Sequence, residues 1–109
     1  MATTYKVLAQ SNPSATTDTN IYTVPSATEA VISTIVVCNQ DAADATFDIA
    51  VRPAGATLAA QHYVAKTVTV GASDSTTLTL GITMAETDVL TVQASTGTVS
   101  FNVFGTELS

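Results

Sequence analysis

Residues that could perform catalysis are scarce in this chain of 109 residues. His62 is the only histidine and Cys38 the only cysteine, so any Ser-His-Asp or Cys-His mechanism would have to use one of them. No G-x-S-x-G motif is present, and Cys38 lies in the apolar run 35–38, without a neighbouring base that would activate a thiolate. We therefore expect His62 to be a surface or packing residue and Cys38 a buried structural thiol. The chain is not expected to be an enzyme.

Carboxylates offer a second possible chemistry, which is metal binding. Asp41, Asp44 and Asp48 cluster around one predicted turn, and Asp18 and Asn20 have D-x-N spacing on another. Neither group follows the ligand pattern of an EF-hand loop, so we interpret them as solvated turn residues, with calcium binding left open as the alternative. One histidine and one cysteine cannot supply the ligands of a zinc site. No metal site is therefore predicted.

Glu86 and Asp88 also lack the arrangement that a paired-carboxylate mechanism requires. Glycoside hydrolysis needs two carboxyl groups that face each other across a cleft, whereas residues two apart on a strand share one face. The nucleotide-binding motifs G-x-x-x-x-G-K-[ST] and G-x-G-x-x-G are absent from the sequence. We expect neither catalytic residues nor a cofactor.

The charge composition narrows the range of partners. Charged residues make up 11% of the chain and the net charge is −6, whereas about 25% charged residues is typical of globular domains. An acidic chain is repelled by nucleic acid and by anionic membranes, and no apolar run is long enough to span a bilayer. The first six residues lack the features of a secretory signal, so synthesis in the cytosol is expected. A neutral surface rich in Thr and Ser is typical of a protein that packs against neighbours.

Alternation of apolar and polar residues recurs along the chain, and no helix-length run has apolar residues at i, i+3, i+4 and i+7. Turn signals rich in Gly, Pro, Asn and Asp separate eight such segments. The predicted strands span residues 5–10, 20–24, 30–39, 45–52, 63–70, 76–82, 89–94 and 99–105. These features predict a single all-β domain over residues 1–109, an antiparallel β-sandwich of the jelly-roll or immunoglobulin-like type. Residues 54–62 are predicted as a helical turn or an extended loop.

The alternation also predicts which side chains could meet a partner. In the last strand Phe101 and Val103 face inward, so strict alternation points Phe104 outward as an interface anchor, with a bulge at Gly105 or coverage by a loop as the alternatives. The run 31–38 is apolar on both faces over its second half, which predicts a central strand whose outer face is covered by a loop, by the connection 54–61 or by another subunit. The candidate interface residues are Phe104, Tyr63, Ile35 and Val37.

Four segments carry a resemblance to a known group of proteins. They are IYTVP (21–25), IVVCN (35–39), FDIAVRPAG (47–55) and VSFNVFG (99–105). Together they resemble small β-sandwich structural proteins of tailed-bacteriophage virions, over most of the chain from about residue 5 to residue 108. These motifs are patterns of strands and turns without a chemical signature, so the resemblance transfers no catalytic residues.

The resemblance implies a structural role in a virion. The expected function is that of a capsid decoration protein, made in the host cytoplasm, that binds the major capsid protein or other virion proteins and forms a homo-oligomer. One alternative is an accessory protein of the tail, neck or baseplate. Another is a host-surface or carbohydrate-binding module, although the absence of Trp and the low aromatic content, 6%, argue against sugar stacking.

Overall fold

The computed structural model describes residues 2–109. Over this range the chain forms strands β1 (Thr3–Ser11), β2 (Thr19–Thr23), β3 (Glu29–Asn39), β4 (Ala45–Arg52), β5 (Tyr63–Val70), β6 (Ser75–Met84), β7 (Val89–Ala94) and β8 (Val99–Leu108). All eight predicted strands are present, and β4, β5 and β7 have the predicted bounds. The ambiguous stretch 54–62 contains both a turn and a loop, because the short 3-10 helices η1 (Pro53–Gly55) and η2 (Ala60–His62) lie on either side of an irregular segment.

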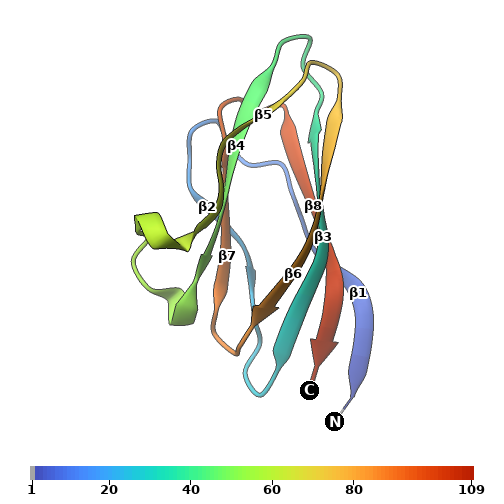
Figure 1. The fold of residues 1–109 in the computed structure, drawn as a ribbon, viewed down its shortest axis with the longest axis vertical. Coiled ribbons are helices and arrows are strands. Elements are labelled where there is room, and N and C mark those ends of the chain that lie inside the picture. Colours follow the sequence, from blue (N-terminus) through green and yellow to red (C-terminus); the bar gives the residue numbers. More distant parts are fainter. Residues whose placement is uncertain (1) are drawn as a thin grey trace.

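The strands form two four-stranded antiparallel sheets (Figure 1). Sheet A has the order β1-β8-β3-β6, and sheet B has the order β2-β7-β4-β5. The first strand pairs with the last, the second with the seventh, the third with the sixth and the fourth with the fifth. Such pairing is that of a long hairpin wrapped into two layers, which is the jelly roll. An immunoglobulin-like sandwich would instead place its first two strands in one sheet.

The core lies between the inner faces of the two sheets. Alternation decides its composition, since Phe47 and Ile49 of β4 and Phe101 and Val103 of β8 are all almost completely buried. The rings of Phe47 and Phe101 meet edge to face across the sheets, with centroids 6.1 Å apart. Contacts of this kind between aromatic rings stabilise a core beyond the effect of buried area alone.

Strand β4 departs from simple alternation because its outer face is covered as well. The outward residues Asp48 and Ala50 are only 8% and 2% exposed. The connection 53–62 packs on this side, where η1 contacts β7 and η2 contacts β4. The expectation that this connection covers the outer face of 31–38 is therefore wrong, since it covers sheet B instead.

Two bulges flank β8 at the same level. One extra residue interrupts the register of β1 at Leu8, and another interrupts β3 at Ser33, opposite Phe104 and Gly105 of β8. At this point the backbones approach so closely that a Cβ atom on Gly105 would lie 2.1 Å from the carbonyl oxygen of Val31. Only glycine fits there. The Ser33 hydroxyl donates to the carbonyl oxygen of Phe104 at 3.1 Å, which satisfies a backbone group next to the bulge.

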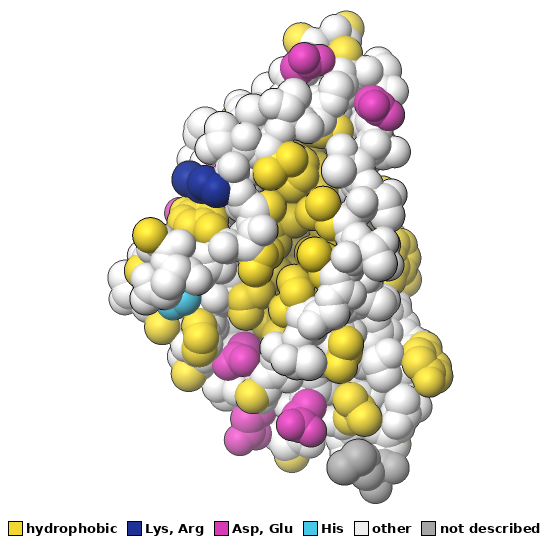
Figure 2. Space-filling model, viewed as in Figure 1, with side chains coloured by type: hydrophobic (Ala, Val, Ile, Leu, Met, Phe, Trp, Pro, Cys, Tyr) yellow, Lys and Arg dark blue, Asp and Glu magenta, His cyan; other side chains and the backbone are white. Residues whose placement is uncertain are grey.

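The two long sides of the sandwich differ. Between β1 and β2 the side is closed by the connection 12–18, in which the Asn12 amide donates to the carbonyl oxygens of Gly97 and Val99 at 3.0 and 2.8 Å. Between β5 and β6 only the short turn 71–74 links the sheets, at one end. Figure 2 shows that hydrophobic atoms line a hollow along this second side. One side of the core is thus closed and the other is open.

Candidate docking face

The outer face of sheet A is a broad surface that no other part of residues 2–109 covers. Its members are the side chains that alternate with the core residues of β1, β8, β3 and β6, and their positions follow from the strand register. They are Tyr5, Val7 and Gln10 of β1, Ser100, Asn102, Phe104 and Thr106 of β8, Val31, Thr34, Val36 and Cys38 of β3, and Ser75, Thr77, Thr79 and Thr83 of β6. We call this surface the A-face.

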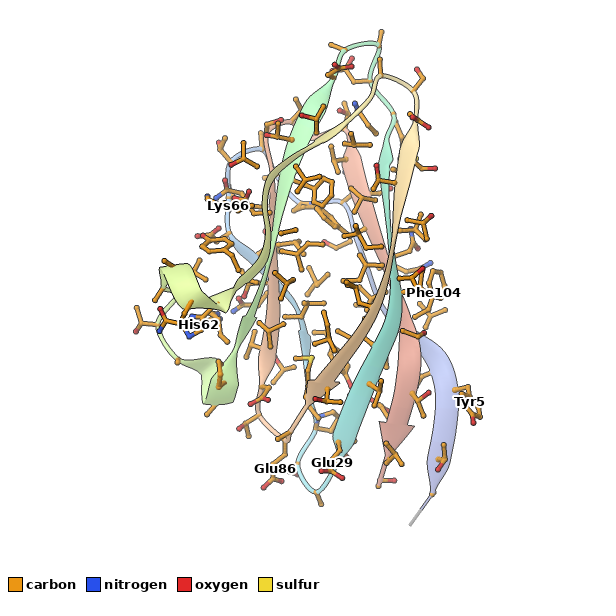
Figure 3. The ribbon with its side chains drawn as sticks, viewed as in Figure 1. Tyr5, Glu29, His62, Lys66, Glu86 and Phe104 are labelled. Carbon is orange, nitrogen blue, oxygen red and sulfur yellow. The ribbon has the colours of Figure 1, made fainter. Side chains whose placement is uncertain are left out.

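Apolar side chains occupy the middle and one edge of the A-face. Phe104 is half-exposed at its centre, beside Val7 in the register, and Tyr5 lies two residues further along β1. Figure 3 shows Phe104 and Tyr5 pointing away from the sandwich. Tyr5 is 83% exposed and Val7 46% exposed, which makes them two of the three large hydrophobic residues that the described chain leaves most open to water. Exposed apolar groups gathered on one face are typical of an interaction surface.

The A-face also carries little charge. The chain has nine acidic and three basic residues, yet the only one of the described charged residues with a place on this face is Glu29, which alternates with the buried Ala30 at the end of β3. Lys6 of β1 belongs to the opposite side, where its Nζ contacts Glu107 at 3.1 Å. Most of the other charged residues lie on turns or on the outer side of sheet B. A charged group buried against such a surface would lose its hydration without gaining an ion pair, so the surface disfavours charged partners.

Only one of the four predicted interface residues lies on this face. Phe104 points outward, as its alternation with Phe101 and Val103 predicts. Ile35 and Val37 are fully buried in the core, so a partner that met this strand would contact Val36 and Cys38 instead. The outward-facing residues of this strand are therefore shifted by one position from the predicted ones.

Tyr63 lies on the other side of the molecule. Its register partner is Ala50, on the outer side of sheet B. The Lys66 ammonium group lies 4.7 Å from the centroid of the Tyr63 ring and 3.1 Å from the Asp48 carboxylate. The hydrogen bond with Asp48 raises the pKa of Lys66. Tyr63 therefore contributes to a local cation–π and ion-pair arrangement away from the A-face.

Four A-face residues were missed by the sequence analysis: Tyr5, Val7, Val36 and Cys38. Alternation could not have found Tyr5 and Val7, because both flank Lys6 in the predicted strand and this pattern would have directed them toward the core. Cys38 is half-exposed rather than buried, which corrects the expectation of a buried structural thiol. The sequence pattern does not show which face of the strand Cys38 occupies, because all residues of 35–38 are apolar.

The histidine forms a local structural contact. Nδ1 of His62 accepts a hydrogen bond from the backbone N–H of Ala59 at 3.1 Å, which closes the turn of η2. His62 is half-buried and lies on the sheet B side of the molecule (Figure 3). Its role as a packing residue agrees with the prediction.

The acidic turn residues are used one by one to hold loops. Carboxylate oxygens of Asp41 and Asp44 accept from the backbone N–H groups of Ala42 and Ala72, respectively. Asp48 accepts from the Lys66 ammonium group and the N–H of Thr67. Within residues 2–109, no three His, Cys, Asp or Glu side chains are grouped as the ligands of one metal ion would be.

Asp18 and Asn20, the pair with D-x-N spacing, also contact different partners. Asp18 accepts from the Gln93 amide, whereas Asn20 accepts from the Arg52 guanidinium group and the Thr91 hydroxyl. These contacts join β2, β7 and β4 across the outer side of sheet B. They explain the D-x-N spacing as a structural feature of that sheet.

Glu86 and Asp88 are turn residues, as predicted. Glu86 accepts from the N–H of Ala27, and Asp88 accepts from the N–H groups of Ala54 and Ala85. Each carboxylate thus stabilises a neighbouring turn. They do not face each other across a cleft.

The fold and its most exposed face define an eight-stranded jelly-roll protein in which the outer face of sheet A carries little charge. Comparisons with protein-family models, with curated proteins and with solved structures find no match to this chain. In the part of the chain that the structure describes, no helix has the length and apolar character that crossing a membrane would require.

Proposed function

We propose that this chain is a non-enzymatic structural protein of a tailed-bacteriophage virion, and that it decorates the outer capsid surface by docking through the A-face. The observation that carries the proposal is the A-face itself, a surface with Phe104, Tyr5 and Val7 exposed and with Glu29 at one end as its one described charged residue, on a chain of net charge −6. Contacts elsewhere would have to desolvate carboxylates that already hold turns. The A-face can be buried at no such cost.

The dimensions of the A-face suit a contact that is repeated many times. A strand of ten residues, such as β8, is about 33 Å long, and four strands span about 19 Å, so the face covers roughly 600 Å². Stable interfaces bury about 800 Å² per partner, which places a single contact at the lower end of the range. Repetition over a lattice would raise the overall affinity without any single strong site.

The fold supports the same role without deciding it. Jelly rolls are used by viral capsid proteins, and also by lectins and cupins, so the topology alone does not assign a function. The resemblance of four segments to virion β-sandwich proteins favours the viral use among these. The proposal therefore rests on the A-face together with that resemblance.

The test is binding of the purified chain to capsid shells of the phage that encodes it. Phe104→Glu places a charge at the centre of the A-face and should abolish binding, while circular dichroism and thermal melting remain those of the wild type. Val64→Glu is the matched control, because Val64 is an exposed hydrophobic residue on the opposite sheet, 49% exposed. Equal loss of binding in both variants would contradict docking through the A-face.

Particles that carry the chain should resist heat and osmotic shock better than particles stripped of it. Copy number separates the capsid position from the alternative in the tail, neck or baseplate. Decoration of a shell requires hundreds of copies, whereas a tail or neck ring has about six or twelve. A low copy number, or stripped particles of undiminished stability, would reject the decoration role.

A further inference from the structure

Strand β6 is an edge strand without the usual protection. It pairs only with β3, so alternate backbone N–H and C=O groups along its other side have no strand partner. Its ten residues, Ser75–Met84, include no charged residue and no proline. Natural edge strands are normally protected by charge, proline, bulges or short length, because an open edge templates pairing with another chain.

The other three edge strands have such protection. Strand β1 contains Lys6 and a bulge at Leu8, and β2 is only five residues long with a register shift of its own. Strand β5 contains Lys66, two register shifts and Thr67 in a left-handed conformation with φ of 53°. In β6 the register is disturbed only near Gly81, and the segment 75–79 pairs regularly with β3. The unprotected edge is therefore the segment 75–79 of β6.

An apolar strip runs beside this edge. Leu78, Leu80 and Ile82 of β6 point toward the core but are only partly buried, as are Ala65 and Val68 of β5. They belong to the open side of the sandwich, where Figure 2 shows the hydrophobic hollow. An occupant that paired with β6 would also cover these side chains.

We propose that this edge joins two copies of the chain by antiparallel pairing of β6 with β6, centred on Thr77. An antiparallel pair of identical strands is symmetric about a two-fold axis, so one edge satisfies both copies at once. Thr77 would face its counterpart, and cross-strand threonine pairs are favourable. Pairing by extended strand addition suits the backbone groups that β6 leaves free.

Charge favours a second copy as the occupant. Each chain carries a net charge of −6, but β6 contributes none of it. Asp74, the charged residue directly before β6, would face position 80 of the other copy rather than a second Asp74. With Thr77 opposite its counterpart, the paired segment is 75–79, a strip about 17 Å long and about 15 Å wide that buries roughly 250 Å² per copy. This total of roughly 500 Å² is that of a weak contact, so the dimer should form only at high protein concentration.

The dimer would contain one continuous sheet of eight strands, with two A-faces side by side. This inference does not depend on the virion role, since it concerns the backbone edge of β6, which β3 separates from Phe104 of β8. Either proposal can fail while the other stands.

The experiment measures the mass of the full chain by sedimentation equilibrium up to millimolar concentration. The wild type should show a reversible monomer–dimer equilibrium. Thr77→Lys places two lysines opposite each other and should weaken the dimer at least tenfold, about the effect expected of opposed like charges. Thr77→Glu should do the same. An equimolar mixture of the two variants should restore a heterodimer.

Thr69→Lys is the matched control, because Thr69 is an exposed threonine on β5, the protected edge strand of sheet B that faces β6 across the open side. It should dimerise like the wild type, and thermal melting should show that all variants are folded. The proposal is overturned if the wild type stays monomeric at the highest concentration, if Thr69→Lys rather than Thr77→Lys weakens the dimer, or if mixing the two Thr77 variants restores nothing.

Discussion

The phenolic hydroxyl of Tyr22 donates to Oε2 of Glu107 at 2.5 Å, and this bond joins β2 of sheet B to β8 of sheet A. The other carboxylate oxygen, Oε1, accepts from Lys6 of β1 at 3.1 Å. Burial raises the pKa of Tyr22, and the hydrogen bond from Tyr22 holds the pKa of Glu107 below its ordinary value. The ionised Glu107 carboxylate thus stabilises the closed side of the sandwich by accepting hydrogen bonds from both Tyr22 and Lys6.

This arrangement predicts a loss of stability in acid. Because the pKa of Glu107 is lower in the folded chain, its contribution is complete above the ordinary glutamate pKa of 4.5 and is lost as the pH falls through the folded-state value. Glu107→Gln should therefore flatten the acid limb of the stability curve measured by urea denaturation. An acid limb as steep as that of the wild type would contradict the assignment.

Removal of the donor tests the same bond at neutral pH. Tyr22→Phe keeps the ring in the core and removes only the hydroxyl, so it should lower the free energy of unfolding by about 1–2 kcal/mol. In alkali the wild type should lose this contribution as the pH rises above 10, the ordinary tyrosine pKa, because the folded chain keeps Tyr22 protonated. Tyr22→Phe should lack that loss. Urea denaturation at neutral and alkaline pH measures both effects.

Gly105 is predicted to be intolerant of substitution. In Gly105→Ala the added Cβ would lie 2.1 Å from the Val31 carbonyl oxygen and 2.9 Å from Cδ1 of Leu8. Backbone atoms on β3 and β8 cannot separate without breaking the register, so we expect a loss of about 2 kcal/mol or more in urea denaturation. Gly81→Ala is the control, since nothing lies within 4 Å of its Cβ position. It should be neutral or stabilising by up to about 1 kcal/mol.

The sequence predicted the strands well and the surface less well, for reasons visible in particular residues. In β8 apolar and polar residues alternate from Val99 to Val103, so an outward Phe104 could be predicted, beside the alternatives of a bulge at Gly105 and of coverage by a loop. In β3 the run 35–38 is entirely apolar. Such a run does not show which of its side chains face the core. The inward set is determined by the bulge at Ser33, which depends on pairing with two neighbouring strands and cannot be read from β3 alone.

Likewise, neither the strand order nor the low charge of the A-face could be predicted without the fold. Residues far apart in sequence, such as Val7, Thr34 and Phe104, become neighbours only through the register of three strands. The sequence indicated a low-charge surface, but not that the neutral residues would gather on one sheet. Composition records how many charges there are, and topology decides where they lie.

Asn39 is predicted to be a critical polar residue of the core. It is 1% exposed, its amide donates to the carbonyl oxygen of Ala43 at 2.8 Å, and its side-chain oxygen accepts from the N–H of Asp41 at 3.0 Å. Asn39→Ala would leave these buried groups unsatisfied and should cost about 2–4 kcal/mol in urea denaturation. Asn102→Ala on the A-face should change stability by less than about 0.5 kcal/mol. Equal effects would show that Asn39 holds no loop.

Cys38 is predicted to react with a maleimide in the folded chain. It lies half-exposed on the A-face between Ser100 of β8 and Ser75 of β6, and no second cysteine contributes to the signal. Labelling followed by mass spectrometry should go to completion without denaturant, whereas a thiol inside the core would react only after unfolding. The bulky adduct would then stand on the face that we propose docks on the capsid, so labelled protein should bind shells poorly. Cys38→Ser, which cannot be labelled, should bind as the wild type does both before and after maleimide treatment, and full binding by the labelled wild type would exclude this part of the A-face from the contact.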